Sequence, residues 1–561
     1  MARNNLNILI GGEAGQGLVT TGQLLAKSLV RAGYYIVVTQ SYQSRIRGGH
    51  NTFAIRVGVD EVIAPQESVD LLVALDKNTA TLHREDLSSD GIILCDEAFD
   101  ISYDACLKVP FKQLAEGKFS NVAYLGVAGA RLGLDQELVA KTLHDLFGKK
   151  HPQVMQKNRE VLEAAVRWYS DQPTSIHKLL PIADPPQRLM MNGNEAIALG
   201  AVSAGLKFFA FYPMTPSTSI SLNLASHAQK MGLIVEQAED EIAAINMAIG
   251  ASFAGAPSMV ATSGGGFALM IEGVSLAAMT ETPVVIAVVQ RPGPATGLPT
   301  RTEQADLELI LHAGHGEFPR AIYAPGTVEE CFHLTQRSLE LAEKSQSPIF
   351  LLADQFLADS YRAVMPFDVE NLPAVRAGNG AFGSSSTYKR FSTTEDGISP
   401  RLLPGMSKHL VVADSDEHTE DGHITENLSV RIQMVEKRLR KGQLIKSEVV
   451  PPDVEGTQDP DLLLVSWGST KGAILEAASR LRSEGEKVAT LHFSQVWPLV
   501  PEQFMGQLEG AKEVVCIEGN ASGQFARLIR RETGFHIEKR VLRYDGLPFT
   551  AESILRELMA S

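Results

Sequence analysis

The chain has 561 residues, a formal net charge of -15 and an isoelectric point near 5.5, and its composition is that of an ordinary globular protein. This length predicts about three or four domains, since a domain usually has roughly 150 residues. The excess of acidic side chains argues against nucleic acid as a partner, because binding to a phosphate backbone needs many Lys and Arg side chains.

The amino-terminal residues lack the charged start, apolar middle and small-residue cleavage site of an export signal. No apolar run approaches the roughly 20 residues that cross a membrane, so we expect a cytoplasmic protein without a membrane partner. The four cysteines, Cys95, Cys106, Cys331 and Cys516, show no metal-ligand spacing. We therefore expect no iron–sulfur cluster and no metal site on this chain.

The first region is predicted to be an α/β domain. An apolar strand, Leu6 to Ile10, precedes the motif Gly12-x-x-Gly15-x-Gly17, which is followed by a helical pattern over 18–32 and a strand over 35–39. The glycines offer backbone amides to a phosphate or carboxylate, and a tight packing turn is the alternative. A dinucleotide is not expected, because Thr39-Gln40-Ser41 lacks the acid that would bind its ribose.

Two cations follow this unit in the segment Arg45-Ile46-Arg47-Gly48-Gly49. They suit an anionic group or a docking surface, because guanidinium groups bind carboxylates and phosphates with two parallel hydrogen bonds. A solvated loop explains the same pattern equally well. Both interpretations of Arg45 and Arg47 stay open at this point.

A second α/β region begins near Gly193. Its apolar strands alternate with helical patterns, which predicts a mostly parallel sheet that binds ligands at the carboxyl ends of its strands. A polar, Gly/Ser/Pro-rich connector with one helix over 428–441 comes next, and a third α/β region starts with a strand over 461–467. The strands predicted for the second region are Phe208–Tyr212, Ser258–Thr262, Val284–Val289 and Ile349–Ala353.

The strongest site signal is the segment Tyr212 to Thr218, which follows a predicted strand. Two prolines, Pro213 and Pro216, restrict the backbone and aim hydroxyl side chains towards a cleft. A plain strand-to-helix turn with Ser217 or Thr218 as the N-cap is the alternative, and the two interpretations are compatible.

Three consecutive acids, Glu239, Asp240 and Glu241, enter an apolar, small-residue helix that runs through Gly250. Such acids usually form an exposed first turn that offsets the helix dipole. The small residues predict burial instead. A carboxylate held in an apolar place has an unusual pKa and is a candidate for a functional site.

The loop over residues 290–307 is rich in Gly, Pro, Thr and Arg and directly follows an apolar strand. This composition predicts a substrate-binding loop, because binding residues concentrate on loops that a rigid sheet positions. Arg291 or Arg301 could hold a carboxylate with two parallel hydrogen bonds. A purely structural loop is the alternative.

These motifs together resemble the alpha subunits of the 2-oxoacid:ferredoxin oxidoreductases. The motifs are Tyr-Pro-x-Thr-Pro at 212–216, Glu-Asp-Glu at 239–241 followed by Gly-Ala-Ser at 250–252, and Gln-Arg-x-Gly-Pro-x-Thr-Gly-x-Pro-Thr at 290–300. The resemblance implies a multidomain α/β protein that fuses a gamma-type part to an alpha-type part. Its implied parts are a gamma-type domain (1–175), a thiamine-diphosphate-binding pyrimidine-type domain (190–360), an extended connector (361–455) and a transketolase C-terminal-like domain (456–561).

The resemblance also assigns roles to single residues. Glu241, nine residues before Gly250, would hydrogen-bond the aminopyrimidine N1′ of thiamine diphosphate, and Glu239 is the reserve candidate. The carboxylate and keto group of a 2-oxoacid would be bound by Thr215 and Arg291. The further assignments are Thr300 and Arg301 for the substrate side chain, Tyr212, Pro213, Ser263 and Gly264 for the cofactor, and Arg45 and Arg47 for coenzyme A or docking.

The chain has no Gly-Asp-Gly…Asn segment to hold Mg²⁺ and the diphosphate. The resemblance implies that a separate beta subunit supplies Mg²⁺ and a [4Fe–4S] cluster, in a pair of alpha–beta units. We therefore expect this chain to be inactive alone.

The implied reaction converts a 2-oxoacid, coenzyme A and oxidised ferredoxin into an acyl-CoA, CO₂ and reduced ferredoxin, and it is reversible for CO₂ fixation. The fused arrangement favours 2-oxoglutarate, with pyruvate and branched-chain or aryl 2-oxoacids as alternatives. A self-sufficient thiamine decarboxylase or transketolase is disfavoured by the missing diphosphate motif. A noncatalytic assembly or electron-docking subunit is the alternative from another class.

Overall fold

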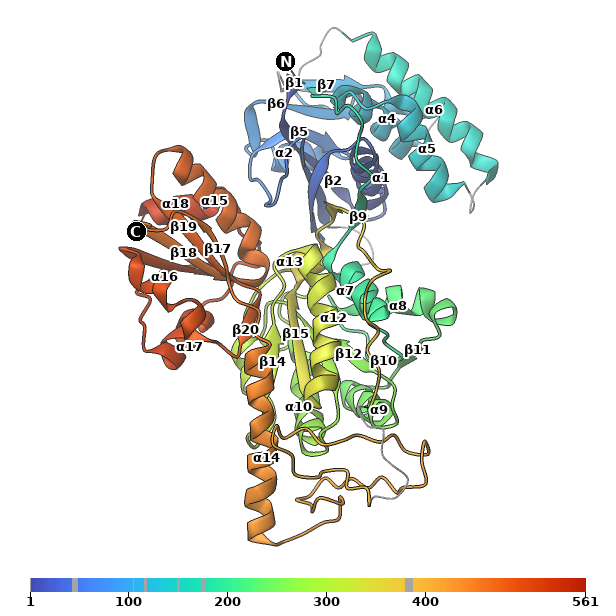
Figure 1. Ribbon diagram of the computed structural model, residues 1–561. Helices are drawn as coiled ribbons and strands as arrows, with labels where there is room; N and C mark the ends of the chain where they lie inside the picture. Colours follow the sequence, from blue (N-terminus) through green and yellow to red (C-terminus); the bar gives the residue numbers. More distant parts are fainter. Residues whose placement is uncertain are drawn as a thin grey trace. The chain divides into compact units, whose positions relative to one another are not determined.

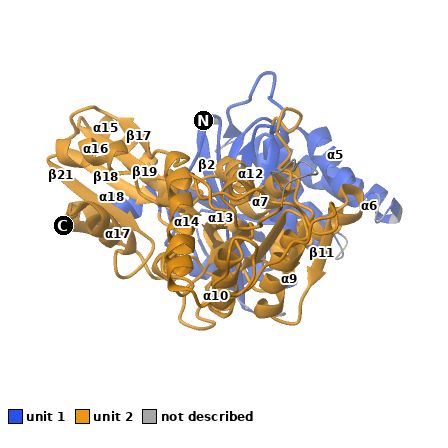
Figure 2. Ribbon diagram, turned by 60° about the horizontal axis from the view of Figure 1, so that its bottom comes forward, with its two compact units in different colours: residues 1–192, 359–367, 550–556 blue, residues 193–358, 368–549, 557–561 orange. Residues whose placement is uncertain are grey.

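The structure, a computed structural model, describes residues 2–42, 49–103, 105–115, 119–148, 152–172, 178–378 and 387–560. The chain forms two compact units, coloured separately in Figure 2. Unit 1 comprises 1–192, 359–367 and 550–556, and unit 2 comprises 193–358, 368–549 and 557–561. No helix in these described ranges has the length and apolar character to span a membrane.

Unit 1 contains a mixed eight-stranded sheet with the order β7-β6-β5-β2-β4-β3-β16-β9. The two predicted first strands lie in this sheet, and β4 pairs antiparallel with both β2 and β3. The strands of the sheet are β2 (Asn5–Glu13), β3 (Tyr35–Ser41), β4 (His50–Gly58), β5 (Val69–Ala74), β6 (Leu87–Asp96), β7 (Cys106–Val109), β9 (Leu189–Met191) and β16 (Arg362–Val364). A separate parallel pair joins β1 (Ala2–Arg3) to β8 (Lys178–Leu179).

Helices pack on this sheet, and the buried apolar side chains of unit 1 form two clusters. The first of them, α1 (Leu18–Arg31), starts after Gly17, which has φ 79°, and a Cβ there would overlap the side chain of Asn121. The glycine turn therefore has a packing role, since only glycine combines this backbone with such a close neighbour. The other helices of unit 1 are α2 (Lys77–Leu82), α3 (Phe111–Leu114), α4 (Ser120–Leu132), α5 (Gln136–Phe147), α6 (Pro152–Ser170) and the start of α18 (Ala551–Ala560).

Unit 2 contains a seven-stranded sheet with the order β11-β10-β12-β13-β15-β14-β20. All neighbours are parallel except β14 and β20, which confirms the predicted mostly parallel arrangement. Every residue of β12, β13 and β15 is buried, because helices cover both faces of a parallel sheet. The strands are β10 (Phe208–Phe211), β11 (Ile234–Gln237), β12 (Ser258–Thr262), β13 (Val284–Gln290), β14 (Ala321–Tyr323), β15 (Pro348–Asp354) and β20 (Gln495–Trp497).

The helices between these strands explain how the site is positioned. In particular, α9 and α10 each start directly after the carboxyl end of a strand or its following turn, where ligands of open α/β sheets bind (Figure 1). The helices of this part are α7 (Gly193–Ser203), α8 (Thr218–Met231), α9 (Glu241–Phe253), α10 (Gly264–Met279), α11 (Leu307–Leu311), α12 (Val328–Ser345) and α13 (Gln355–Asp359).

A five-stranded sheet with the order β17-β19-β18-β21-β22 forms the carboxyl-terminal part of unit 2. One apolar core runs from the seven-stranded sheet into this sheet and includes Ile322, Trp467 and Phe525. Its elements are β17 (Asp453–Gly456), β18 (Leu462–Trp467), α15 (Lys471–Ser483), β19 (Val488–Phe493), α16 (Met505–Gly510), β21 (Glu513–Glu518), α17 (Gln524–Thr533) and β22 (Lys539–Leu542).

The connector is more ordered than its polar sequence suggests. The predicted helix over 428–441 is present as α14 (Leu428–Ser447), the long helix drawn in orange in Figure 1. One stretch that the sequence assigned to the connector, β16, belongs to the sheet of unit 1. The four predicted domain boundaries otherwise stay a prediction.

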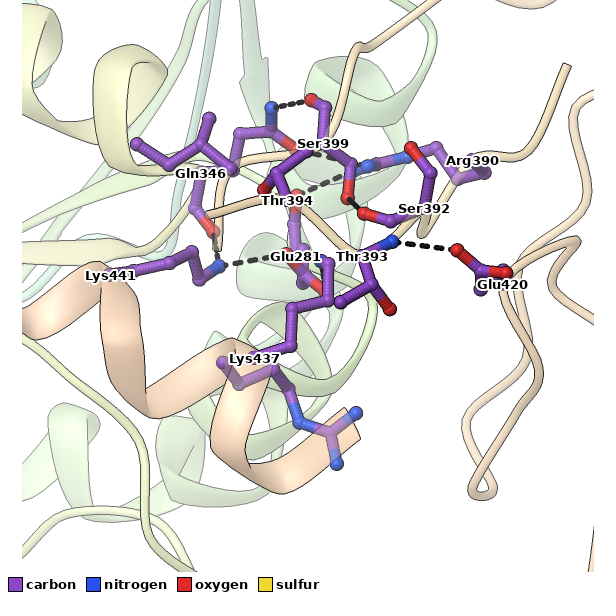
Figure 3. Close-up of polar contacts among 12 residues, drawn as sticks. Glu281, Gln346, Arg390, Ser392, Thr393, Thr394, Ser399, Glu420, Lys437 and Lys441 are labelled. Atoms are coloured by element: carbon purple, nitrogen blue, oxygen red, sulfur yellow. Dashed lines mark hydrogen bonds and ion pairs between the residues drawn. The ribbon is translucent and has the colours of Figure 1, made fainter. Parts of the chain in front are cut away.

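A cluster of buried charges fastens the connector to the core of unit 2 (Figure 3). Lys437 Nζ donates to Glu281 Oε1 at 2.6 Å, and Lys441 Nζ lies 3.1 Å from Glu281 Oε2. The Arg390 guanidinium donates to the Glu281 carbonyl oxygen at 2.7 Å and to Gln346 Oε1 at 2.9 Å. These five residues join the connector to the loops that follow α10 and α12.

Burial alone would raise the pKa of the Glu281 carboxyl. The nearby charges of Lys441, Lys437 and Arg390 outweigh burial and hold this pKa well below its usual range. Burial lowers the pKa of Lys441 to about 8, against the opposing effect of Glu281. Each charge in the cluster therefore depends on its partners, because an isolated buried charge is costly.

We expect Glu281→Gln to destabilise the docked connector by about 3–5 kcal/mol, because it leaves buried cations without their counter-ion. Hydrogen exchange of the α14 amides measures the free energy of this local opening. The matched control is Glu340→Gln, which removes an exposed partner of Lys344 and should cost less than about 0.5 kcal/mol. Equal protection of α14 in both variants would contradict the proposed role of Glu281.

Candidate active site

The three consecutive acids before α9 have three different surroundings. Glu239 is exposed. Asp240 is the N-cap, and its carboxylate accepts a hydrogen bond from the Ala243 N–H at 2.7 Å. Glu241, the first residue of the helix, is only 3% exposed. Burial thus distinguishes Glu241 from its two neighbours.

The Glu241 carboxylate has an unsatisfied oxygen: Oε1 is buried and forms no hydrogen bond with any residue that the structure describes. An unsatisfied buried carboxylate oxygen is costly, so such an atom indicates a site where a ligand donates. The oxygen lies against the first turn of α10, where a Cβ on Gly266 would be 2.5 Å from it and 2.3 Å from Thr262 Oγ1. An aminopyrimidine is a group that fits this acceptor.

A second carboxylate, Asp306, lies against the same turn. A Cβ on Gly264 would be 2.3 Å from its Oδ2, which is also buried and has no hydrogen-bond partner in the described part of the chain. The glycines at the start of α10 thus leave room for two carboxylates at a helix amino terminus, where negative charge is favoured. The sequence predicted that Ser263 and Gly264 contact the cofactor, and this stays a prediction. In the structure, Gly264 lies against Asp306.

The segment after β10 turns sharply beside this point. Its Thr215–Pro216 peptide is cis, and the Asn194 side-chain amide donates to the Pro216 carbonyl oxygen at 2.9 Å. Met214 Sδ lies 3.9 Å from Thr262 Oγ1. The segment that gave the strongest sequence signal therefore lies next to the Glu241 site.

Arg291 connects this turn to the following loop. Its Nη1 donates to the Thr215 carbonyl oxygen at 2.6 Å. Burial lowers the pKa of the Arg291 guanidinium, and Asp306 opposes this effect. Burial also raises the pKa of the Asp306 carboxyl to about 6, although Arg291 counteracts the shift. The positive charge of Arg291 and the negative charge of Asp306 therefore stabilise each other.

The loop over 291–306 is anchored at its far end by Gln304. Gln304 Nε2 donates to the Trp467 carbonyl oxygen at 2.9 Å, and Gln304 Oε1 accepts from the Gly519 N–H at 2.8 Å. The Asn520 side-chain amide donates to the Gln304 carbonyl oxygen at 3.2 Å. The carboxyl-terminal sheet thus positions the loop that carries Arg291.

The remaining predicted residues have varied positions. Thr300 is buried, and the stem of Arg301 lies against Gly546. Tyr212 is 39% exposed and Pro213 is exposed. The contacts around α10 and the cis peptide connect Glu241, Thr215 and Arg291 into one site. They do not extend to the other four side chains. Arg45 and Arg47 lie outside the described residues.

Sequence reasoning missed three residues that shape this site, namely Asn194, Gln304 and Asp306. The available signal was weak: Asp306 is an acid directly before the apolar start of α11, and Gln304 lies two residues earlier. Their importance comes from partners distant in sequence, such as Gly264 and Gly519.

Comparisons with known proteins show which family the whole chain resembles. The family model described as "Pyruvate flavodoxin/ferredoxin oxidoreductase, thiamine diP-bdg" matches residues 199–437. The model "Pyruvate ferredoxin/flavodoxin oxidoreductase" matches residues 7–168. A 2-oxoacid:ferredoxin oxidoreductase subunit alpha from Sulfolobus sp is 31% identical, and the alignment covers 99% of this chain and 96% of that protein.

This chain belongs to the alpha subunits of the 2-oxoacid:ferredoxin oxidoreductases. The alpha subunit is thus part of a thiamine-diphosphate-dependent oxidoreductase, as the sequence motifs predicted. Another relative, 2-oxoglutarate oxidoreductase subunit KorA of Mycobacterium tuberculosis, is 27% identical over 99% of this chain and 91% of its own. The predicted multidomain α/β fold class is confirmed.

A solved structure also resembles the alpha subunit over its whole length. It is the 2-oxoglutarate:ferredoxin oxidoreductase from Magnetococcus marinus with 2-oxoglutarate, coenzyme A and succinyl-CoA bound. The TM-score is 0.93 at 31% identity, and the match covers 100% of this chain and 99% of that chain.

We expect Gly266→Ala to destabilise the alpha subunit by about 1–3 kcal/mol, because its methyl group would overlap Glu241 Oε1 and Thr262 Oγ1. The matched control is Gly265→Ala, whose methyl group would meet only Ala295 O at 3.6 Å. That variant should be neutral or slightly stabilising, because Ala favours helix. Chemical unfolding of both variants measures the difference, and a similar free energy of unfolding for both would refute the packing argument.

Asp306 should make stability depend on pH. Its pKa in the folded chain is raised to about 6, so its contribution to stability is fully present below its unfolded pKa of about 3.9 and is lost as the pH rises through about 6. Asp306→Asn cannot ionise. We expect this variant to gain up to about 2 kcal/mol relative to wild type between about pH 4 and pH 7. The measurement is the free energy of unfolding of both proteins at several pH values. A difference between them that does not change with pH over this range would contradict the prediction.

Proposed function

We propose that this alpha subunit supplies Glu241 as the acid that contacts the N1′ atom of thiamine diphosphate. The observation that carries the proposal is the buried Glu241 Oε1, for which the described residues provide no hydrogen-bond partner. When bound, thiamine diphosphate supplies the electron sink needed for loss of CO₂ from a 2-oxoacid. Glu241 would hold a proton at N1′ and so set the protonation of the exocyclic amine. The exposure of Glu239 favours Glu241 over the reserve candidate.

Arg291 and Thr215 would bind the substrate. The hydrogen bond from Arg291 Nη1 to the Thr215 carbonyl oxygen orients a guanidinium that has five N–H donors in a fixed plane. A carboxylate suits such a donor set. Thr300 and Arg301 stay candidates for selecting the substrate side chain. Tyr212, Pro213, Ser263 and Gly264 stay candidates for cofactor contacts.

The substrate we infer is 2-oxoglutarate, which would react with coenzyme A and oxidised ferredoxin to give succinyl-CoA, CO₂ and reduced ferredoxin. The support is the similarity to the KorA relative and to the solved 2-oxoglutarate:ferredoxin oxidoreductase. The reaction could run in reverse and fix CO₂. Pyruvate and branched-chain 2-oxoacids are the alternatives within the family.

A beta subunit would complete the site with Mg²⁺, the diphosphate-binding residues and a [4Fe–4S] cluster. The chain has no Gly-Asp-Gly motif, and apolar side chains are exposed on the two helices beside Glu241. Ile242 is 51% exposed on α9 and Leu269 is 52% exposed on α10. Such apolar exposure is typical of a surface that a partner covers. A pair of alpha–beta units acting in the cytoplasm is the expected assembly.

The remaining assignments follow the resemblance. We infer a gamma-type domain over 1–175, a pyrimidine-type domain over 190–360, a connector over 361–455 and a transketolase C-terminal-like domain over 456–561. Arg45 and Arg47 would bind coenzyme A or a docking partner. Ferredoxin would accept the electrons from the cluster on the beta subunit.

Glu241→Gln should lower turnover of the anaerobically reconstituted alpha–beta complex by about 10²–10⁴-fold, as expected for loss of a proton-transfer group. Glu239→Gln is the matched control and should retain activity. The measurement is coenzyme-A-dependent reduction of a low-potential dye. Unchanged turnover of Glu241→Gln in a cofactor-loaded complex would refute its role and favour a noncatalytic assembly or electron-docking subunit.

The same assay with 2-oxoglutarate, pyruvate and branched-chain 2-oxoacids tests the substrate. We expect kcat/KM for 2-oxoglutarate to exceed that for pyruvate by at least about 100-fold, because a paired second carboxylate is worth several kcal/mol. Arg301→Met should reduce this preference if Arg301 binds the distal carboxylate. A higher kcat/KM for another acid would overturn the substrate assignment while leaving the family unchanged.

A further inference from the structure

Two of the four cysteines lie together in unit 1. Cys95 is on β6 and Cys106 is on the neighbouring edge strand β7. The parallel register pairs Ile93 with Cys106 and Cys95 with Lys108. Both cysteines therefore point to the same face of the sheet, as diagonal neighbours. Their Sγ atoms are 2.9 Å apart.

This distance is short for two thiols and puts the two sulfur atoms in direct contact. A disulfide has an S–S length of about 2.0 Å, so the sulfur atoms need to approach by only roughly 0.9 Å. Both cysteines are free in the structure. The register brings the two sulfurs together on one face of the sheet, and closing the bond requires the two side chains and the edge strand β7 to adjust.

The two thiols have different surroundings. Cys95 is completely buried in an apolar cluster with Leu72 and Ile93. Cys106 is partly exposed. The hydrogen bond with the Cys95 thiol lowers the pKa of Cys106, burial opposes the shift, and Lys108 adds to it. The same hydrogen bond and burial raise the pKa of Cys95. Cys106 is thus the accessible nucleophile and Cys95 is the protected second thiol.

We propose that Cys95 and Cys106 form a redox-reactive dithiol that a low-molecular-weight disulfide converts into an intramolecular disulfide. The thiolate of Cys106 attacks one sulfur of the small disulfide, which forms a mixed disulfide and releases one small thiolate. Cys95 then loses its proton to solvent and attacks Cys106 Sγ. The second small thiolate leaves. The pair loses two electrons, and the small disulfide gains them.

The other two cysteines provide internal controls. Cys331 and Cys516 are fully buried, and burial raises the pKa of both thiols. Neither is exposed to a small disulfide in the folded chain. A disulfide that forms only between Cys95 and Cys106 therefore reports their local geometry rather than general oxidation.

The test uses the anaerobically purified full chain and oxidised glutathione as the probe. After acid quenching and alkylation, trypsin releases residues 85–108 as one peptide, because no Lys or Arg lies between Arg84 and Lys108. The expected product is this peptide two hydrogens lighter and without alkyl groups. Further cleavage before Asp96 should leave two fragments joined by the disulfide. Cys331 and Cys516 should stay alkylatable after unfolding, reacting with the probe at least about tenfold more slowly than Cys106.

Single variants separate the two roles. Cys95→Ser should accumulate a glutathione adduct on Cys106, because the second step is blocked. Cys106→Ser should leave Cys95 reduced, with an adduct forming at least about tenfold more slowly. In the wild-type time course, the transient adduct should be found on Cys106, which tests the order of attack without any substitution. The matched control Cys331→Ser should close the disulfide as wild type does.

A wild-type peptide that stays fully alkylatable at equilibrium with oxidised glutathione would overturn the proposal. Adducts that form equally on Cys95 and Cys106 would also overturn it, since they would mean that the structure does not distinguish the thiols. Because the readout is peptide mass, it is independent of the proposed catalytic function.

Discussion

The buried carboxylate of Glu281 is the interaction on which the organisation of unit 2 depends. The carboxylate accepts a hydrogen bond from Lys437 and lies 3.1 Å from the Lys441 ammonium group. The backbone carbonyl of the same residue accepts a hydrogen bond from Arg390. All four side chains are almost completely buried. Because a polar connector has few apolar side chains to bury, its order here rests on charges that would be costly without one another. Removing Glu281 would therefore leave the cations buried without a partner.

This anchor also bears on the candidate site through α10. Glu281 follows the end of this helix by two residues, while the first turn of the same helix contacts Glu241 and Asp306. A helix transmits position along its length because its backbone hydrogen bonds resist deformation. The connector and the site are thus attached to opposite ends of one rigid element. At the site end, Arg291 and Gln304 add connections to the cis-peptide turn and the carboxyl-terminal sheet.

Much of the fold could be predicted from local patterns. The buried strands β12, β13 and β15 are short apolar runs separated by longer helical segments, so the parallel sheet was predictable. The site was predictable to the level of its segments. Local patterns could not tell which acid is buried, because Glu239 and Glu241 have the same chemistry and differ only in their place relative to the start of α9. The choice of Glu241 came from the family resemblance instead.

The sequence by itself determined the α/β class, the family through its motifs, and the segments that carry Glu241, Thr215 and Arg291. Only the tertiary structure decided that Asp306 reaches Gly264, that three cations of a polar connector are buried on Glu281, and that Cys95 meets Cys106. The physical reason is the range of the interactions. Propensity and periodicity act within a few residues, whereas burial and charge pairing depend on partners that only the packed chain brings together.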